Sequence, residues 1–191
     1  MTSCGSKSDK ELLRLCLEDN EYFSCIVDRY EEKLKRYLRR SSRFDEQTCE
    51  DVLQEVFIKV YRYMNDYDED YAFSSWIYRI THNELIDHVR KAAKGPVAMD
   101  LKGDEFVNYI EMIPGKSDLP QEYGKKELAA LVRKSLFALP QKYREVLVLR
   151  FLEEKSYTEI SDILKRSVGS VSVLINRAKD KLKNQLLSIH S

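Results

Sequence analysis

Apolar residues recur three and four positions apart along two long segments of the chain, which is the spacing of one face of an α-helix. The first segment carries Phe23, Ile26, Val27, Tyr30, Leu34, Tyr37 and Leu38. The second carries Cys49, Val52, Leu53, Val56, Phe57, Val60, Tyr61 and Met64. Their opposite faces are mostly polar, and no strand-like alternation competes with this pattern. The pattern therefore predicts an all-α fold.

Polar residues mark where the N-terminal helices should begin. Ser8 and Glu11 fit a capping box, in which each side chain bonds a backbone amide near the other residue. Asn20 can cap the second helix, and Ser74 or Ser75 can cap a fourth helix that we expect over 76–91. These starts predict a bundle of four helices.

The C-terminal part has the spacing of a helix-turn-helix. One helix is expected over 126–138, and Pro140 suits the first turn of the next. A second capping box, formed by Ser156 and Glu159, opens a short helix. After a turn at 165–167 a longer helix follows, with an apolar stripe of Val168, Val171, Leu174, Ile175, Ala178, Leu182 and Leu186. A short helix, a tight turn and a longer helix are typical of DNA-binding modules.

Between these two parts the chain is rich in residues that break regular structure. They are Gly95, Pro96, Pro114, Gly115, Pro120 and Gly124. We therefore expect two small helical domains, residues 1–94 and 125–191, joined by a flexible linker over 95–124. At 191 residues, the chain is long enough for two compact cores.

Charge is distributed unevenly, although 32 basic and 32 acidic residues give a net charge of zero. Residues 1–94 carry 16 basic and 19 acidic groups, residues 95–124 carry 2 and 6, and residues 125–191 carry 14 and 7. Because charge is screened within about 8 Å at physiological salt, a polyanion responds to the local excess. The C-terminal third is therefore the electrostatic candidate for binding nucleic acid.

Several classes of protein and site are disfavoured by the sequence. No apolar run approaches the roughly 20 residues of a membrane span, so we expect a cytoplasmic protein without a membrane partner. The cysteines at 4, 16, 25 and 49 lack zinc-site spacing, and we expect them to be reduced and to serve in packing rather than in disulfides. The acidic loop at 65–70 departs from a calcium loop at Tyr71 and Ile77, so no metal or cofactor is predicted.

The polar side of the third helix gathers a narrow arc of residues. Its members are Asp51, Gln54, Glu55, Ile58 and Arg62. A solvated helix face with one stray isoleucine would give the same pattern. On the fourth helix Arg79, Asn83 and Arg90 share a stripe with Trp76 beside it, a combination that suits a nucleic-acid strand because aromatic rings stack on bases and guanidinium groups hold phosphates.

The last helix presents small and polar residues opposite its apolar stripe. The candidates for base or phosphate contacts are Arg166, Ser170, Ser172, Val173, Asn176, Arg177 and Lys179. Small residues permit close approach to a major groove, Asn and Arg can pair with base edges, and an outward valine can touch a thymine methyl. A helical hairpin that docks on another protein would share this pattern.

The order of these motifs resembles the extracytoplasmic-function (ECF) group of bacterial sigma factors over almost the whole chain. The matching segments are Glu50–Phe57 (region 2.2), Phe73–Ile80 (region 2.3), Asn83–Arg90 (region 2.4), Leu139–Val146 (region 4.1) and Ser156–Ala178 (region 4.2). Many relatives have a basic residue in place of Ser172 and a glycine near Lys165.

The resemblance implies a transcription initiation factor without catalytic residues, which binds the β and β′ subunits of core RNA polymerase. The arc on the third helix would dock on β′. Tyr67, Trp76, Arg79, Asn83 and Arg90 would bind the melted strand of the −10 promoter element. The last helix would read the −35 element, and a separate anti-sigma factor is an expected partner. An autonomous helix-turn-helix regulator is the alternative that the residues leave open.

Overall fold

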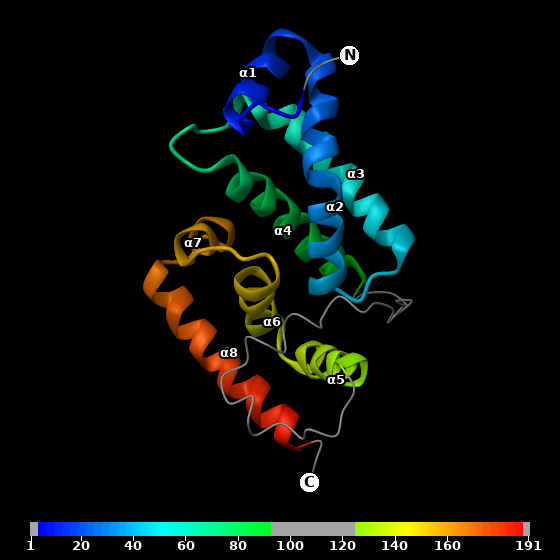
Figure 1. Ribbon diagram of the computed structural model, residues 1–191, viewed down its shortest axis with the longest axis vertical. Coiled ribbons are helices and arrows are strands. Elements are labelled where there is room, and N and C mark those ends of the chain that lie inside the picture. The colour runs from blue at the N-terminus through cyan, green and yellow to red at the C-terminus, as the bar shows by residue number, and fades with distance from the viewer. Residues whose placement is uncertain (1–3, 93–124, 189–191) are drawn as a thin grey trace. The chain divides into compact units, whose positions relative to one another are not determined.

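A computed structural model describes residues 4–92 and 125–188, and every regular element in these two ranges is helical (Figure 1). The chain divides into two compact units, with α1–α4 in the first and α5, α6 and α8 in the second. The prediction of two helical domains in an all-α chain is confirmed. The predicted linker over 95–124 lies outside the described residues, so the boundaries at 94 and 125 stay predictions.

Over residues 4–92, the first unit contains four α-helices. They are α1 (Asp9–Glu18), α2 (Phe23–Ser41), α3 (Glu46–Tyr63) and α4 (Phe73–Ala92). Short 3-10 turns, Asn20–Tyr22 and Met64–Asp66, lie before α2 and after α3. Tyr37 of α2 lies at the centre of the core, where its ring packs on Tyr78 of α4 at a centroid distance of 5.3 Å.

Helix starts show where short polar motifs decide local structure. Both capping boxes form: the side-chain oxygens of Ser8 and Ser156 accept a hydrogen bond from the backbone amide of the glutamate three residues later, and the backbone amide of each serine donates to the carboxylate of that glutamate. The caps predicted for α2 and α4 are wrong. Asn20 opens the 3-10 turn and Asp19 caps it, while α4 begins at Phe73, so that the nearby serines lie inside its first turn.

The apolar stripe of α3 is mostly core, as its spacing predicts. Val52, Val56 and Val60 are fully buried. At the edge of the stripe, however, Tyr61 is 40% exposed, and Phe57 is only partly covered. Both rings pack edge-on against Phe23 of α2, at centroid distances of 5.2 and 6.4 Å. The stripe is therefore wider than the core beneath it.

Two of the four cysteines contradict the prediction of reduced thiols. Cys4 and Cys25 form a disulfide with Cα atoms 5.5 Å apart, because the segment before α1 folds back along α2. This pairing depends on a tertiary contact that the spacing of cysteines in the sequence cannot show. Cys16 and Cys49 are free and fully buried, as a packing role requires.

The C-terminal part of the chain contains α5 (Lys125–Ala138), α6 (Gln141–Leu147), α7 (Tyr157–Leu164) and α8 (Val168–Ser188), with a π-helical turn at Val148–Leu152 after α6. Pro140 caps α6 from outside instead of filling its first turn. The core is aliphatic, and its fully buried members include Leu136, Leu147, Leu149, Ile160 and Ile175.

The turn between α7 and α8 forms as predicted at 165–167. Lys165 ends α7 in the left-handed backbone region, with φ 52° and ψ 49°. Glycine is the residue that adopts this conformation without steric cost. The turn therefore keeps the geometry that a glycine would supply even though a lysine occupies the position.

Candidate functional site

The arc on α3 lies on the exposed side of the helix. Asp51, Gln54 and Arg62 are exposed, and Ile58 is 51% exposed although it is a large aliphatic residue. Glu55 is only partly exposed, because its carboxylate lies 3.0 Å from Nε2 of His88 on α4. This hydrogen bond lowers the pKa of Glu55. The arc is thus one continuous polar surface around a single exposed isoleucine, with Glu55 fixed at its α4 edge.

Tyr67 lies in the loop between α3 and α4 and rests on buried aromatic rings. Its ring centroid is 5.4 Å from Trp76 and 5.6 Å from Phe73, and its hydroxyl donates a hydrogen bond to the backbone oxygen of Tyr71. Trp76 is only 7% exposed. In this structure Trp76 packs against the ring of Tyr67 and does not offer an open stacking face of its own.

The stripe on α4 borders a concave surface. Asn83 and Arg90 are exposed, Arg79 is partly buried, and Arg90 lies 3.6 Å from Asp87. A hollow of about 560 Å³ adjoins Asn83 and Arg90 and extends to α3. Of the predicted DNA-binding residues of this helix, Asn83 and Arg90 therefore line a depression, whereas Trp76 and Arg79 lie outside it.

An ion pair lies in the wall of this hollow. Lys59 of α3 donates to the carboxylate of Glu84 on α4, which is almost fully buried. This hydrogen bond raises the pKa of Lys59. The pair spans 25 residues of sequence, so neither helix alone predicts it.

The polar face of α8 is open to solvent. Arg166, Ser170, Asn176 and Arg177 are exposed, and Val173 is 48% exposed. Ser172 and Lys179 are partly covered; the ammonium of Lys179 lies 5.1 Å from the ring centroid of Phe151. Ser170 also bonds the side chain of Ser167 at the start of the helix (2.8 Å). Arg166 thus lies in the turn before α8, and the other six predicted residues lie on α8 itself.

Glu145 of α6 is a buried acid that the sequence reasoning missed. It is 6% exposed, and burial raises its pKa to about 7, against the opposing effect of Arg166 and Arg144. The available signal was a pair of charged residues, Arg144 and Glu145, between Tyr143 and the apolar run that begins at Val146. Since Arg166 is a predicted DNA contact, this acid links the core of the unit to its candidate binding face.

Among the described residues, no group of three or more His, Cys, Asp or Glu side chains is arranged to hold a metal ion. In the same part of the chain, no helix is long and apolar enough to cross a membrane.

Family models match both units. Sigma-70 region 2 matches residues 26–95, and Sigma-70 region 4 matches residues 130–182. The ECF RNA polymerase sigma factor SigW of Bacillus subtilis (strain 168) is 34% identical over 172 residues, which cover 88% of this chain and 90% of SigW. The chain belongs to the ECF family of RNA polymerase sigma factors.

Other similar proteins agree with this assignment. The ECF RNA polymerase sigma-E factor of Haemophilus influenzae is 32% identical over 171 residues, covering 88% of this chain and 89% of that protein. The solved structure of CnrH in complex with the cytosolic domain of CnrY is similar with a TM-score of 0.69 and 25% identity, over 97% of this chain and 100% of that one.

Membership in the ECF family gives the chain its function: it directs RNA polymerase to promoters as a transcription initiation factor. The autonomous regulator is not favoured, because sequence similarity to sigma factors covers both the helix-turn-helix and the unit that precedes it. On this ECF sigma factor, the candidate binding surfaces are the arc on α3, the loop with Tyr67 together with the stripe on α4, and the polar face of α8.

Proposed function

We propose that the ECF sigma factor uses three surfaces, one to dock on polymerase and two to recognise the promoter. The arc on α3 docks on the polymerase β′ subunit, with β as a further contact. Tyr67, Arg79, Asn83 and Arg90 capture the melted strand of the −10 element, and Trp76 takes part by holding the ring of Tyr67. Arg166, Ser170, Ser172, Val173, Asn176, Arg177 and Lys179 bind the −35 element.

The observation that carries the docking assignment is Ile58. A 51% exposed isoleucine surrounded by polar side chains gives a protein partner both apolar area and charge to bind. DNA offers little apolar surface apart from base faces and thymine methyls, so this arc suits a protein better than a nucleic acid. The arc also lies on a rigid helix whose other face is core.

Strand capture follows from the chemistry of the loop and of α4. Moving a base out of the duplex stack costs a few kcal/mol of free energy. Stacking of that base on a protein ring and hydrogen bonds to its edge can offset this cost. Tyr67 supplies a ring that is already held on Phe73 and Trp76, and Asn83 supplies an amide beside the hollow. No covalent step is needed, and we propose that the chain has no catalytic residue.

Two further assignments belong to this proposal. We place the chain in the cytoplasm, where core polymerase and promoter DNA are found. We also propose that a separate anti-sigma factor controls it. The similar protein CnrH was solved with the cytosolic domain of CnrY bound, which supports a protein partner of this kind.

The docking surface can be tested by assembly with purified core polymerase. We expect an Asp51→Ala/Gln54→Ala variant to bind core polymerase at least about tenfold more weakly, because truncation of central interface residues costs 1 kcal/mol or more each. Glu31 and Glu32 are exposed acids on α2 outside the arc, and their alanine variant is the matched control. Unchanged polymerase affinity of the first variant, with folding intact, would refute the assignment.

A further inference from the structure

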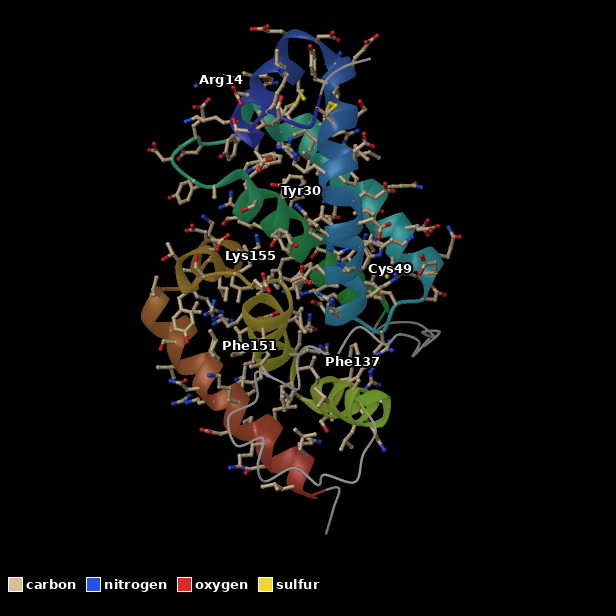
Figure 2. All side chains as sticks on the ribbon, in the orientation of Figure 1. Arg14, Tyr30, Cys49, Phe137, Phe151 and Lys155 are labelled. Atoms are coloured by element: carbon tan, nitrogen blue, oxygen red, sulfur yellow. A yellow bond between two sulfur atoms is a disulfide. The ribbon has the colours of Figure 1, made fainter. Side chains whose placement is uncertain are left out.

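The N-terminal segment before α1 is fastened to α2 by covalent and polar contacts. Besides the Cys4–Cys25 disulfide, the guanidinium of Arg29 donates to the backbone oxygens of Cys4 (3.0 Å) and Lys7 (2.8 Å) and to the carboxylate of Asp9 (2.7 Å). Figure 2 shows the bonded sulfur pair in this part of the first unit. The start of α1 is therefore held at two neighbouring points of α2.

From the same helix, α1, two cations reach the loop that carries Tyr67. Lys10 Nζ lies 2.6 Å from Oε2 of Glu69, and Arg14 Nη2 lies 3.0 Å from the same oxygen. Figure 2 labels Arg14 on α1. Hydrogen bonds from Lys10 and Arg14 lower the pKa of Glu69. Exposed ion pairs are individually weak, but two of them on one carboxylate join segments 55 residues apart in sequence.

Asp9 makes a second connection to the loop through packed rings. Its carboxylate accepts a hydrogen bond from the hydroxyl of Tyr30 (2.5 Å), whose ring packs edge-on against Phe73 at 5.5 Å. Phe73 in turn contacts both Tyr67 and Trp76. The first turn of α1 thus contacts the loop by two routes. One is the ion pair between Lys10 and Glu69, and the other runs from Asp9 through Tyr30 and Phe73 to Tyr67.

We propose that α1 positions the strand-capturing loop and that the Cys4–Cys25 couple acts as a redox switch that sets how firmly α1 is held. This inference rests on the proposed role of Tyr67. Disulfides of cytosolic proteins are usually transient and redox-sensing rather than permanent. With the disulfide formed, the loop is preorganised; with the cysteines reduced, the N-terminal segment is held by noncovalent contacts, among them the hydrogen bonds of Arg29.

The switch operates by thiol–disulfide exchange with a small-molecule disulfide. The Cys4 thiolate attacks one sulfur of that molecule and releases the first small thiol. The Cys25 thiolate then attacks the Cys4 sulfur of the mixed disulfide and releases the second. The two cysteines lose two protons and two electrons, and the small disulfide gains them as two thiols. Cys4 is the partly exposed member of the pair and the entry point for reduction.

The test uses holoenzyme assembled from the full chain and core polymerase, equilibrated with oxidised or with reduced glutathione. The probe is a fluorescent single-stranded oligonucleotide pool enriched on the oxidised holoenzyme. We expect about fivefold tighter strand binding after oxidation, a typical size for coupling between sites, with equal affinity for core polymerase in both states. A Cys4→Ser/Cys25→Ser variant should bind like the reduced protein in both buffers.

A charge swap tests the positioning contacts separately. Glu69→Lys should weaken strand binding in the oxidised state, and adding Lys10→Glu with Arg14→Glu should restore it. Glu31→Lys on α2 changes the same charge at an exposed site away from the loop and should have no effect. A loop that merely needs a negative charge would not recover in the triple variant.

Three outcomes would overturn the inference. The first is a chain whose cysteines stay reduced in oxidised glutathione by intact-mass analysis. The second is a disulfide that forms without changing strand affinity. The third is a failure of the oxidised holoenzyme to bind any single strand although the oxidised chain still binds core polymerase, which would also remove the strand-capture role. The second outcome leaves that role intact, so the two failures are distinguishable.

Discussion

Lys165 ends α7 with a positive φ of 52°, a conformation that strains any residue with a Cβ atom. We expect Lys165→Gly to stabilise the second unit by about 0.5–1 kcal/mol, because the relieved strain exceeds the entropy that glycine gains in the unfolded chain. Urea unfolding measures the difference. Lys165→Ala removes the same side chain but keeps the Cβ atom; equal stability of the two variants would contradict the strain argument.

The buried Glu145 predicts an unusual dependence of stability on pH. Burial raises the pKa of Glu145 to about 7 from an ordinary 4.5, so the folded chain holds a proton that the unfolded chain releases between these values. The free energy of unfolding should therefore fall as pH rises from 4.5 to 7, by up to about 3 kcal/mol. Glu145→Gln should abolish this slope in urea titrations at several pH values.

Glu159 is the control for that measurement. Burial alone would raise the pKa of Glu159, but hydrogen bonds from Ser156 in the capping box lower it. Its contribution to stability is therefore present above the unfolded pKa and is lost as pH falls through the lower folded value. Glu159→Gln should remove stability near neutral pH and leave the slope between pH 4.5 and 7 downward.

At the scale of helices, the face of α8 leads to a prediction about DNA sequence preference. Asn176 is exposed on the candidate −35 surface, where an amide can form paired hydrogen bonds with adenine. We expect Asn176→Ala to cost about 1–3 kcal/mol in discrimination at one base pair, measured by promoter selection from a randomised −35 library with holoenzyme. Asn184→Ala, two turns further along the same helix and also exposed, should leave the selected sequence unchanged.

The helices themselves were largely predictable, because their evidence is local. Four-turn apolar periodicity identifies α3, and two capping boxes fix the starts of α1 and α7. Where a single polar residue was the only signal, as for Asn20, the predicted start is wrong. Asp19 offers the same kind of side-chain cap one position earlier, and local sequence does not choose between them.

Contacts between helices could not be predicted from the spacing of apolar and polar residues. The disulfide, the Lys59–Glu84 pair and the two cations on Glu69 join residues 21 to 59 positions apart in sequence, so no helical period reports them. Trp76 shows the opposite error: projection placed it beside an exposed stripe, but the packing of Tyr67 and Phe73 buries it. The candidate surfaces were predictable as helix faces, whereas their supporting contacts were not.

At the scale of the whole molecule, the net charge of zero limits what the free chain can do. Nonspecific binding to duplex DNA comes mainly from neutralised phosphates, and only residues 125–191 carry a strong basic excess. We expect the full chain alone to bind a promoter fragment with a Kd of about 10⁻⁴–10⁻⁶ M at physiological salt. Fluorescence anisotropy in a salt series measures this.

The same salt series separates phosphate contacts from base contacts. Arg166→Ala should reduce the salt slope of holoenzyme binding by about one and weaken all duplex sequences alike, whereas Asn176→Ala should leave the slope unchanged. Nanomolar, sequence-specific binding by the free chain would contradict the view that polymerase brings both units onto a promoter, and it would revive an autonomous regulator.

The two unpaired cysteines give the chain an internal reference for chemical labelling. Burial raises the pKa of Cys16, and it raises that of Cys49 to about 11, so neither thiol is an effective nucleophile at neutral pH in the folded chain. An alkylating reagent should therefore add nothing to the oxidised chain and at least one group, on the partly exposed Cys4, to the reduced one. The mass of the intact folded chain would then report the state of the Cys4–Cys25 couple directly in a cell extract.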